Sequence, residues 1–170
     1  MNSAYASYLL TIADRLGREQ FEVHTKIQLP NYLFDLLGFK ETYSLSWTTE
    51  PGMRLLCLIG FAAEPALEYA RDYFKAATIF AQTYRREDRP HSKLIFPVLV
   101  SNYLTDDLAS FIQREEPHTL GEPGGGLVHP VLVSLDRRAA YHREKEASDA
   151  LGYRGTLYTT LGELLSPLPH

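Results

Sequence analysis

Phe96-Pro97-Val98-Leu99-Val100-Ser101 decides the fold, because the chain repeats it 33 positions later as His129-Pro130-Val131-Leu132-Val133-Ser134. Each copy is a proline, an uninterrupted Val/Leu run and a small polar residue, a pattern typical of strands buried on both faces of a parallel or mixed sheet. Pro is tolerated at the first residue of a strand, so each proline predicts where its strand begins. The segment between the copies can hold the crossover that parallel strands need. We therefore expect two parallel neighbouring strands in the core.

The segments around the repeat extend this core to an α/β order of elements. Apolar spacing predicts a helix over 3–16, and Phe21, Val23, Thr25 and Ile27 alternate as on one face of a strand over 20–28. The stretch 31–38 fits one or two helical turns. The remaining expectations are strands over 41–48 and 53–61 that form a hairpin, a helix over 65–86, a strand over 94–101, a short helix capped by Thr105, a glycine-rich loop over 115–127, the second repeated strand ending near 135, and an exposed helix or loop over 137–150.

The composition predicts one soluble α/β domain over residues 1–170, with a mixed central sheet flanked by helices. A net charge of −4 supplies no electrostatic reason for tight binding to nucleic acid or membranes. The single cysteine, Cys57, stands in an apolar run, which favours a buried thiol in a reducing compartment. The first residues lack a basic start and an apolar signal region, and no apolar run reaches the ~20 residues of a membrane span. We expect a cytoplasmic protein.

The order of elements (α-β-β-β-α-β-α-β) is similar to the core of the restriction-endonuclease-like fold. That family places an acidic residue near the second strand and Glu-x-Lys on the third. Here the third strand is Met53-Arg54-Leu55-Leu56-Cys57-Leu58-Ile59-Gly60-Phe61, which has neither a carboxylate nor a lysine. Since metal-assisted hydrolysis needs converging oxygen ligands, the resemblance implies an inactive relative.

Polar residues follow both repeated strands, where ligands bind in open α/β sheets. These candidate ligand-binding residues are Ser101, Asn102, Asp106, Asp107, Ser134 and Asp136. The alternative is that they are strand terminators and helix caps, roles that Ser, Asn and Asp favour. No motif for a nucleophile, a phosphate loop or a metal centre occurs, so the sequence indicates no catalytic residue, no cofactor and no metal.

Two further groups of residues suggest partners. The helix over 65–86 has apolar residues around more than half of its circumference, beyond the stripe that an ordinary surface helix needs. Its candidate interface residues for another copy or another protein are Tyr69, Tyr73, Phe80 and Tyr84. A basic cluster comprises Arg137, Arg138, Arg143 and Lys145, and it could contact nucleic acid or simply be a solvated face.

These observations leave three functional hypotheses. The first is a non-catalytic interaction or accessory protein that self-associates through the 65–86 helix. The second is a degenerate nuclease-like module that contacts nucleic acid through the basic cluster. The third is an enzyme or ligand binder that uses the carboxylates of Asp106, Asp107 and Asp136.

Overall fold

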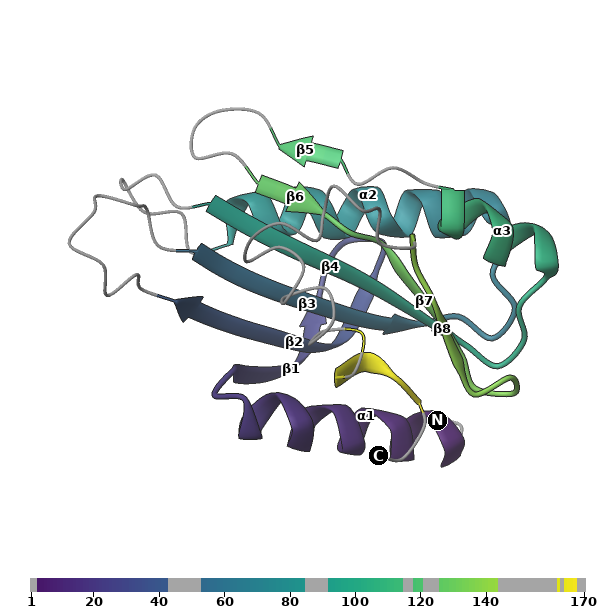
Figure 1. Ribbon diagram of the computed structural model, residues 1–170, viewed down its shortest axis with the longest axis horizontal. Helices are drawn as coiled ribbons and strands as arrows, with labels where there is room; N and C mark the ends of the chain where they lie inside the picture. The colour runs from purple at the N-terminus through teal and green to yellow at the C-terminus, as the bar shows by residue number, and fades with distance from the viewer. Residues whose placement is uncertain are drawn as a thin grey trace.

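The two copies of the repeated phrase lie side by side in one mixed sheet (Figure 1). The computed structural model describes residues 3–42, 53–84, 92–114, 118–120, 126–143, 162 and 164–167. The first copy lies in β4 (Ser92–Ser101) and the second ends in β7 (Val131–Ser134), which runs parallel to β4. Val98 pairs with Val131, so the pairing offset equals the 33-residue spacing of the repeat. β7 is buried along its whole length, and the prediction of two buried parallel neighbours is confirmed.

The two prolines of the repeat have different positions in their strands. Pro130 comes directly before β7, as predicted. Pro97 instead lies inside β4 and is the partner of Leu58 in β3 (Met53–Phe61). The prediction that Pro97 begins its strand is wrong, because the pairing of β3 with β4 already starts at Ser92.

Two short strands occupy part of 115–127, where the sequence predicted only a loop. β6 (Gly126–Val128) is parallel to β4, and β5 (His118–Leu120) is antiparallel to β6. The backbone N–H of His129 donates a 2.8 Å hydrogen bond to the carbonyl of Ile95. β6 and β7 thus continue along the same side of β4 with a break between them. The loop prediction is wrong here because strands of three residues depend on their neighbours for hydrogen bonds, and their own sequence carries little signal.

The other half of the sheet is antiparallel. β1 (Glu22–Gln28) pairs with β2 (Leu33–Thr42), and β2 pairs with β3, so the predicted hairpin of the second and third strands is confirmed. The helical turns expected over 31–38 are wrong, since this stretch forms most of β2. Its long buried run has no period-2 alternation because β2 is covered on both faces. Of the strand expected over 41–48, residues 41 and 42 end β2 and the rest lie outside the described residues.

Strand β1 does not keep one apolar face, contrary to the alternation in its sequence. Val23 packs against the core on one side of the sheet, whereas Ile27 packs against the core on the other. Lys26 lies between them with a φ of 58°, in the left-handed region that side chains rarely adopt. This residue breaks the alternation of the strand, and a kinked edge with an exposed lysine discourages pairing with other sheets.

Strand β8 (Ala139–Tyr141) replaces part of the helix or loop expected over 137–150. It pairs antiparallel with β7, bringing Ala139 opposite Ser134. The turn between them includes Arg138 at a φ of 51°. The charged sequence hides this strand because its pairing partner β7 determines it; the part of that segment after 143 lies outside the described residues.

Helices cover both faces of the sheet and produce two cores. α1 (Ser3–Arg18) and residues 164–165 pack on one face, where Ile12, Cys57, Phe96 and Val131 are buried. α2 (Leu67–Thr83) and α3 (Asp106–Arg114) pack on the other face, with Phe34, Leu58, Leu99 and Leu132. Figure 1 shows α1 beside the yellow C-terminal turn and away from α2 and α3. The α/β sheet flanked by helices is therefore as predicted.

The wide apolar surface of α2 is largely used inside the molecule. Tyr73 is 1% exposed, and its ring contacts the edge of Phe34. Phe80 lies 5.9 Å from Phe34 between ring centroids, and Tyr84 packs on Phe39 at 5.6 Å. The second element that this helix was expected to touch is thus supplied by β2 of the same chain.

The thiol of Cys57 is buried in β3, as its apolar surroundings predicted. Burial raises its pKa to about 12, so the thiol is protonated and unreactive near neutral pH. Among the described helices, none combines the length and the apolar composition that crossing a membrane requires.

Candidate functional site

The parallel strands bring the predicted polar residues together at their carboxyl ends. Ser101 and Ser134 are direct partners across β4 and β7, and both are fully buried. α3 begins at Asp106, five residues after β4 ends, so its N-terminus lies at the same edge. Thr105 caps this helix, accepting a 3.3 Å hydrogen bond from the backbone N–H of Leu108, as predicted.

The hydroxyl of Ser101 organises the loop that follows β4. Its Oγ lies 2.9 Å from the carbonyl oxygen of Ala63 and 2.6 Å from that of Tyr103, and it accepts a 3.1 Å bond from the backbone N–H of Tyr103. The same N–H lies 3.3 Å from the carbonyl of Ala63. Ser101 therefore ties the end of β4 to the segment before α2, and its polar capacity is consumed there.

Ser134 and Asp136 form a turn at the end of β7. The Ser134 hydroxyl donates a short hydrogen bond to the Asp136 carboxylate, which also accepts a 2.8 Å bond from the backbone N–H of Arg137. The bond from Ser134 is the main cause that holds the pKa of Asp136 below its usual range. The carboxylate is ionised near neutral pH and serves this turn.

Arg137 joins the two strand ends. Its guanidinium donates to the Leu104 carbonyl at 3.0 Å and forms a 2.8 Å ion pair with Asp106. A hydrogen bond with Tyr141 and the Asp106 carboxylate raise the pKa of this guanidinium further. The Asp106 side chain is 87% exposed, which leaves the ion pair at the surface, where its contribution to stability is small.

The remaining candidates at this edge have separate roles. Asp107 is exposed in the first turn of α3, and Asn102 is half-buried in the loop after β4. Within the described ranges, no three His, Cys, Asp or Glu residues stand close enough to hold a metal ion. The carboxylates of the third hypothesis therefore serve an ion pair, a turn and an exposed helix start.

The predicted interface and nucleic-acid residues are distributed differently from the pattern in the sequence. Tyr69 is 40% exposed, whereas Phe80 and Tyr84 are half-buried and Tyr73 has an internal role. Arg137 is occupied by its ion pair, Arg138 is exposed and Arg143 is half-buried. Lys145 lies outside the described residues.

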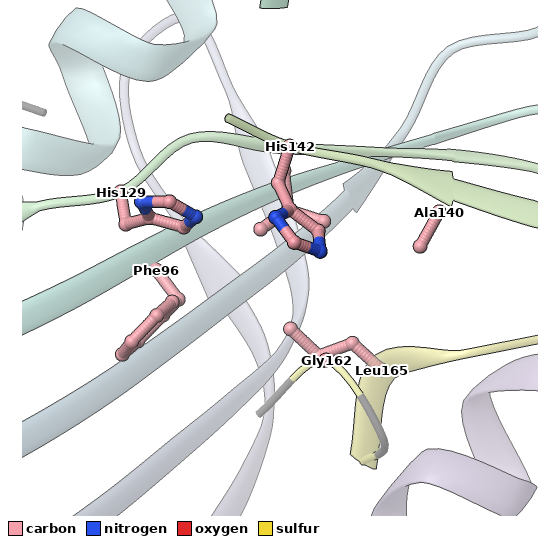
Figure 2. Close-up of a pocket in the computed structure, with 7 residues that line it drawn as sticks. Phe96, His129, Ala140, His142, Gly162 and Leu165 are labelled. Atoms are coloured by element: carbon pink, nitrogen blue, oxygen red, sulfur yellow. The ribbon is translucent and has the colours of Figure 1, made fainter. Parts of the chain in front are cut away.

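A small cavity lies on the opposite face of the strands, and the sequence did not reveal it. Its lining residues are Phe96, His129, Val131, Ala140, His142, Gly162 and Leu165. Its volume of about 10 Å³ is close to the room that one water molecule needs. Figure 2 shows the two imidazoles next to each other, with Gly162 and Leu165 across the cavity from Ala140 and His142. The cavity can hold a small polar guest between apolar walls.

The two imidazoles approach through the register of the repeat. Because the offset is constant, His129 occupies the place in its copy that Phe96 occupies in β4, and the two ring centroids lie 5.9 Å apart. His129 is 6% exposed and lies 5.4 Å from the ring of His142. His142 Nδ1 is 2.8 Å from the Arg143 carbonyl, so this nitrogen carries the proton. The exchange of Phe for His between the copies was the one signal in the sequence for this cavity.

No family model, curated protein or solved structure matches this chain.

Proposed function

We propose that this protein is a non-catalytic interaction protein that self-associates through the surface at the carboxyl ends of β4 and β7. This carboxyl-edge surface comprises Tyr103, Asp106, Asp107, Arg137 and Arg138. The proposal places the ligand-binding residues of the sequence and the self-association hypothesis at one location, and it assigns the polar residues there to supporting a contact surface.

The rigid presentation of Tyr103 is the observation that carries this proposal. The Tyr103 side chain is 53% exposed, while its backbone N–H is held by Ser101 and Ala63. Arg137 bonds the next carbonyl along the chain, that of Leu104. A large aromatic ring on a fixed backbone loses little conformational entropy on binding, and Tyr and Arg are enriched in interfaces and their hot spots.

The charges of the surface suit contact with a second copy. Asp107 and Arg138 are both exposed, and neither has an ion pair or hydrogen-bonding side-chain partner among the described residues. A two-fold interface places the same patch on both sides. A patch that carries both signs can therefore be complementary to itself.

Sedimentation velocity across the micromolar range tests the proposal. We expect a concentration-dependent dimer for the wild-type chain and an association weakened about tenfold or more by Tyr103→Ala, since central aromatic residues dominate interface energies. Leu10→Ala is the matched control, because Leu10 is 74% exposed on α1, which packs on the other face of the sheet. A chain that stays monomeric at high micromolar concentration, or a Tyr103→Ala chain that associates as strongly as wild type, would contradict the proposal.

A nuclease-like module that contacts nucleic acid is the second candidate, and the strand directions favour it. β1, β2 and β3 are antiparallel neighbours and β4 is parallel to β3, in the order that the resemblance implies. Arg138 and Arg143 would then contact phosphates. Binding of short DNA or RNA duplexes at low salt that is lost on Arg138→Ala with Arg143→Ala would support this candidate, and an absence of binding at low salt would remove it.

A further inference from the structure

The C-terminal segment, residues 164–166, lies in a cleft between α1 and the sheet (Figure 1). Leu164 is 8% exposed and Leu165 is 1% exposed, and both belong to the core that α1 covers. Leu165 also closes one side of the histidine-lined cavity, as Figure 2 shows. Two adjacent leucines thus anchor the end of the chain in a site built by residues far away in the sequence.

The cleft recognises the backbone of this segment. The Tyr8 hydroxyl donates a 2.9 Å hydrogen bond to the Leu165 carbonyl. Arg15 Nη1 donates to the carbonyls of Leu164 at 3.2 Å and Ser166 at 2.6 Å. Tyr8 and Arg15 are seven residues apart, two helical turns, and lie on the same side of α1. The backbone N–H of Ser166 bonds the Gly162 carbonyl, so the free carbonyls belong to a helical turn. A cation at such carbonyls is favoured by the helix dipole.

We infer that this cleft is a docking site for a dileucine segment, and that in the dimer residues 164–166 of a second copy occupy it. Every printed polar contact ends on a main-chain carbonyl, and the apolar contacts come from two leucines. The same contacts form without any change when the segment comes from another copy, which is the basis of reciprocal segment exchange. This inference rests on the self-association proposed above and adds a second contact to it.

A complementation experiment with full-length chains tests the exchange. One variant, Tyr8→Phe with Arg15→Met, loses the donors of the cleft but keeps its ring, its stem and an intact segment. The other variant, Leu165→Asp, keeps an intact cleft but has a segment that cannot be buried. Each variant alone should associate at least tenfold more weakly than wild type. A one-to-one mixture should recover heterodimers, because the segment of the first variant can enter the cleft of the second.

A peptide experiment tests the cleft without requiring a dimer. The segment of the same chain competes at an effective concentration on the order of millimolar, so the receptor is the full-length Leu165→Asp chain. A labelled peptide of residues 162–170 should bind it, and a peptide with Leu164→Asp and Leu165→Asp should bind at least tenfold more weakly. Near-ultraviolet circular dichroism verifies that the receptor is folded, and the milder Leu165→Ala chain replaces it otherwise.

The outcomes separate this inference from the proposed function. A wild-type dimer that Leu165→Asp leaves equally strong, or a mixture that associates no better than its components, overturns the exchange while self-association stands. Peptide binding to a chain that is monomeric at every concentration upholds the docking site and overturns self-association. A folded receptor that binds neither peptide overturns the docking site.

Discussion

Tyr73 shows how one buried polar group can connect a helix to a sheet. Its hydroxyl lies 2.8 Å from the Val98 carbonyl in β4 and 3.1 Å from the Leu58 carbonyl in β3, and it donates to these adjacent strands. The ring is fully buried against Phe34 and Phe74. Burial is the main cause that raises the pKa of this phenol, which stays protonated and able to donate over the physiological range.

Tyr73→Phe should lower the free energy of unfolding by about 1–2 kcal/mol, because the ring still fills its site while buried carbonyls lose a donor. Urea denaturation of the two chains measures this difference. The control is Tyr69→Phe on the same helix, where a 40% exposed side chain should leave stability nearly unchanged. Equal losses for the two variants would show that the hydroxyl of Tyr73 has no special role.

At the scale of elements, the closest approach of α2 to the sheet depends on Gly60 in β3. A Cβ at this position would lie 2.9 Å from Tyr73 Cε2 and 3.0 Å from the Leu33 carbonyl oxygen. Both neighbours belong to packed elements, so neither can move without displacing α2 or β2. The glycine thus allows a tyrosine ring to lie directly on the main chain of the strand.

Gly60→Ala should therefore destabilise the protein by about 1–3 kcal/mol through overpacking. Gly17→Ala is the matched control, since no atom lies within 4 Å of a Cβ there and the residue belongs to α1. That substitution should stabilise the chain by up to about 1 kcal/mol, because Ala is the better helix former. Thermal unfolding of both variants measures the contrast, and a Gly60→Ala chain as stable as Gly17→Ala would refute the packing argument.

For the whole molecule, the two cores bury several groups that are weak acids. Burial raises the pKa of Cys57 to about 12 and raises the pKa of Tyr5, Tyr8 and Tyr73 above the ordinary phenol value. For Tyr5, a hydrogen bond to the Asp35 carboxylate adds to the effect of burial. The folded chain consequently holds protons that the unfolded chain releases in alkaline solution.

The free energy of unfolding should fall as the pH rises above 9.0, the ordinary thiol value, and continue to fall toward 12. In this window the unfolded state binds fewer protons than the folded state, which makes the slope negative, by at most about 1.4 kcal/mol per pH unit for each group. Denaturant titrations at a series of pH values measure the slope. Cys57→Ala should flatten the first part of the fall, before the phenols titrate, and an unchanged slope in that variant would contradict the buried thiol's contribution.

Local sequence patterns determined the elements that bury long apolar runs. The doubled phrase predicted two parallel buried neighbours, and its spacing of 33 residues is the offset by which Val98 meets Val131. The same patterns predicted α1 and α3 and the antiparallel pairing of β2 with β3. The helix expected over 65–86 also forms, although α2 spans only Leu67–Thr83. These elements are legible because their apolar residues follow the period of the structure that buries them.

The tertiary structure alone decided the features that depend on partners distant in the chain. β8 forms because β7 offers it a neighbour, and Tyr8 meets the Leu165 carbonyl across 157 positions. The polar residues at the ends of β4 and β7 were predicted to gather, but their bonds to Ala63 and Leu104 were not. A backbone carbonyl looks the same in every residue, so no sequence pattern states which side chain will bond it. Chain packing makes that choice, and with it the shapes of the carboxyl-edge surface and the dileucine cleft.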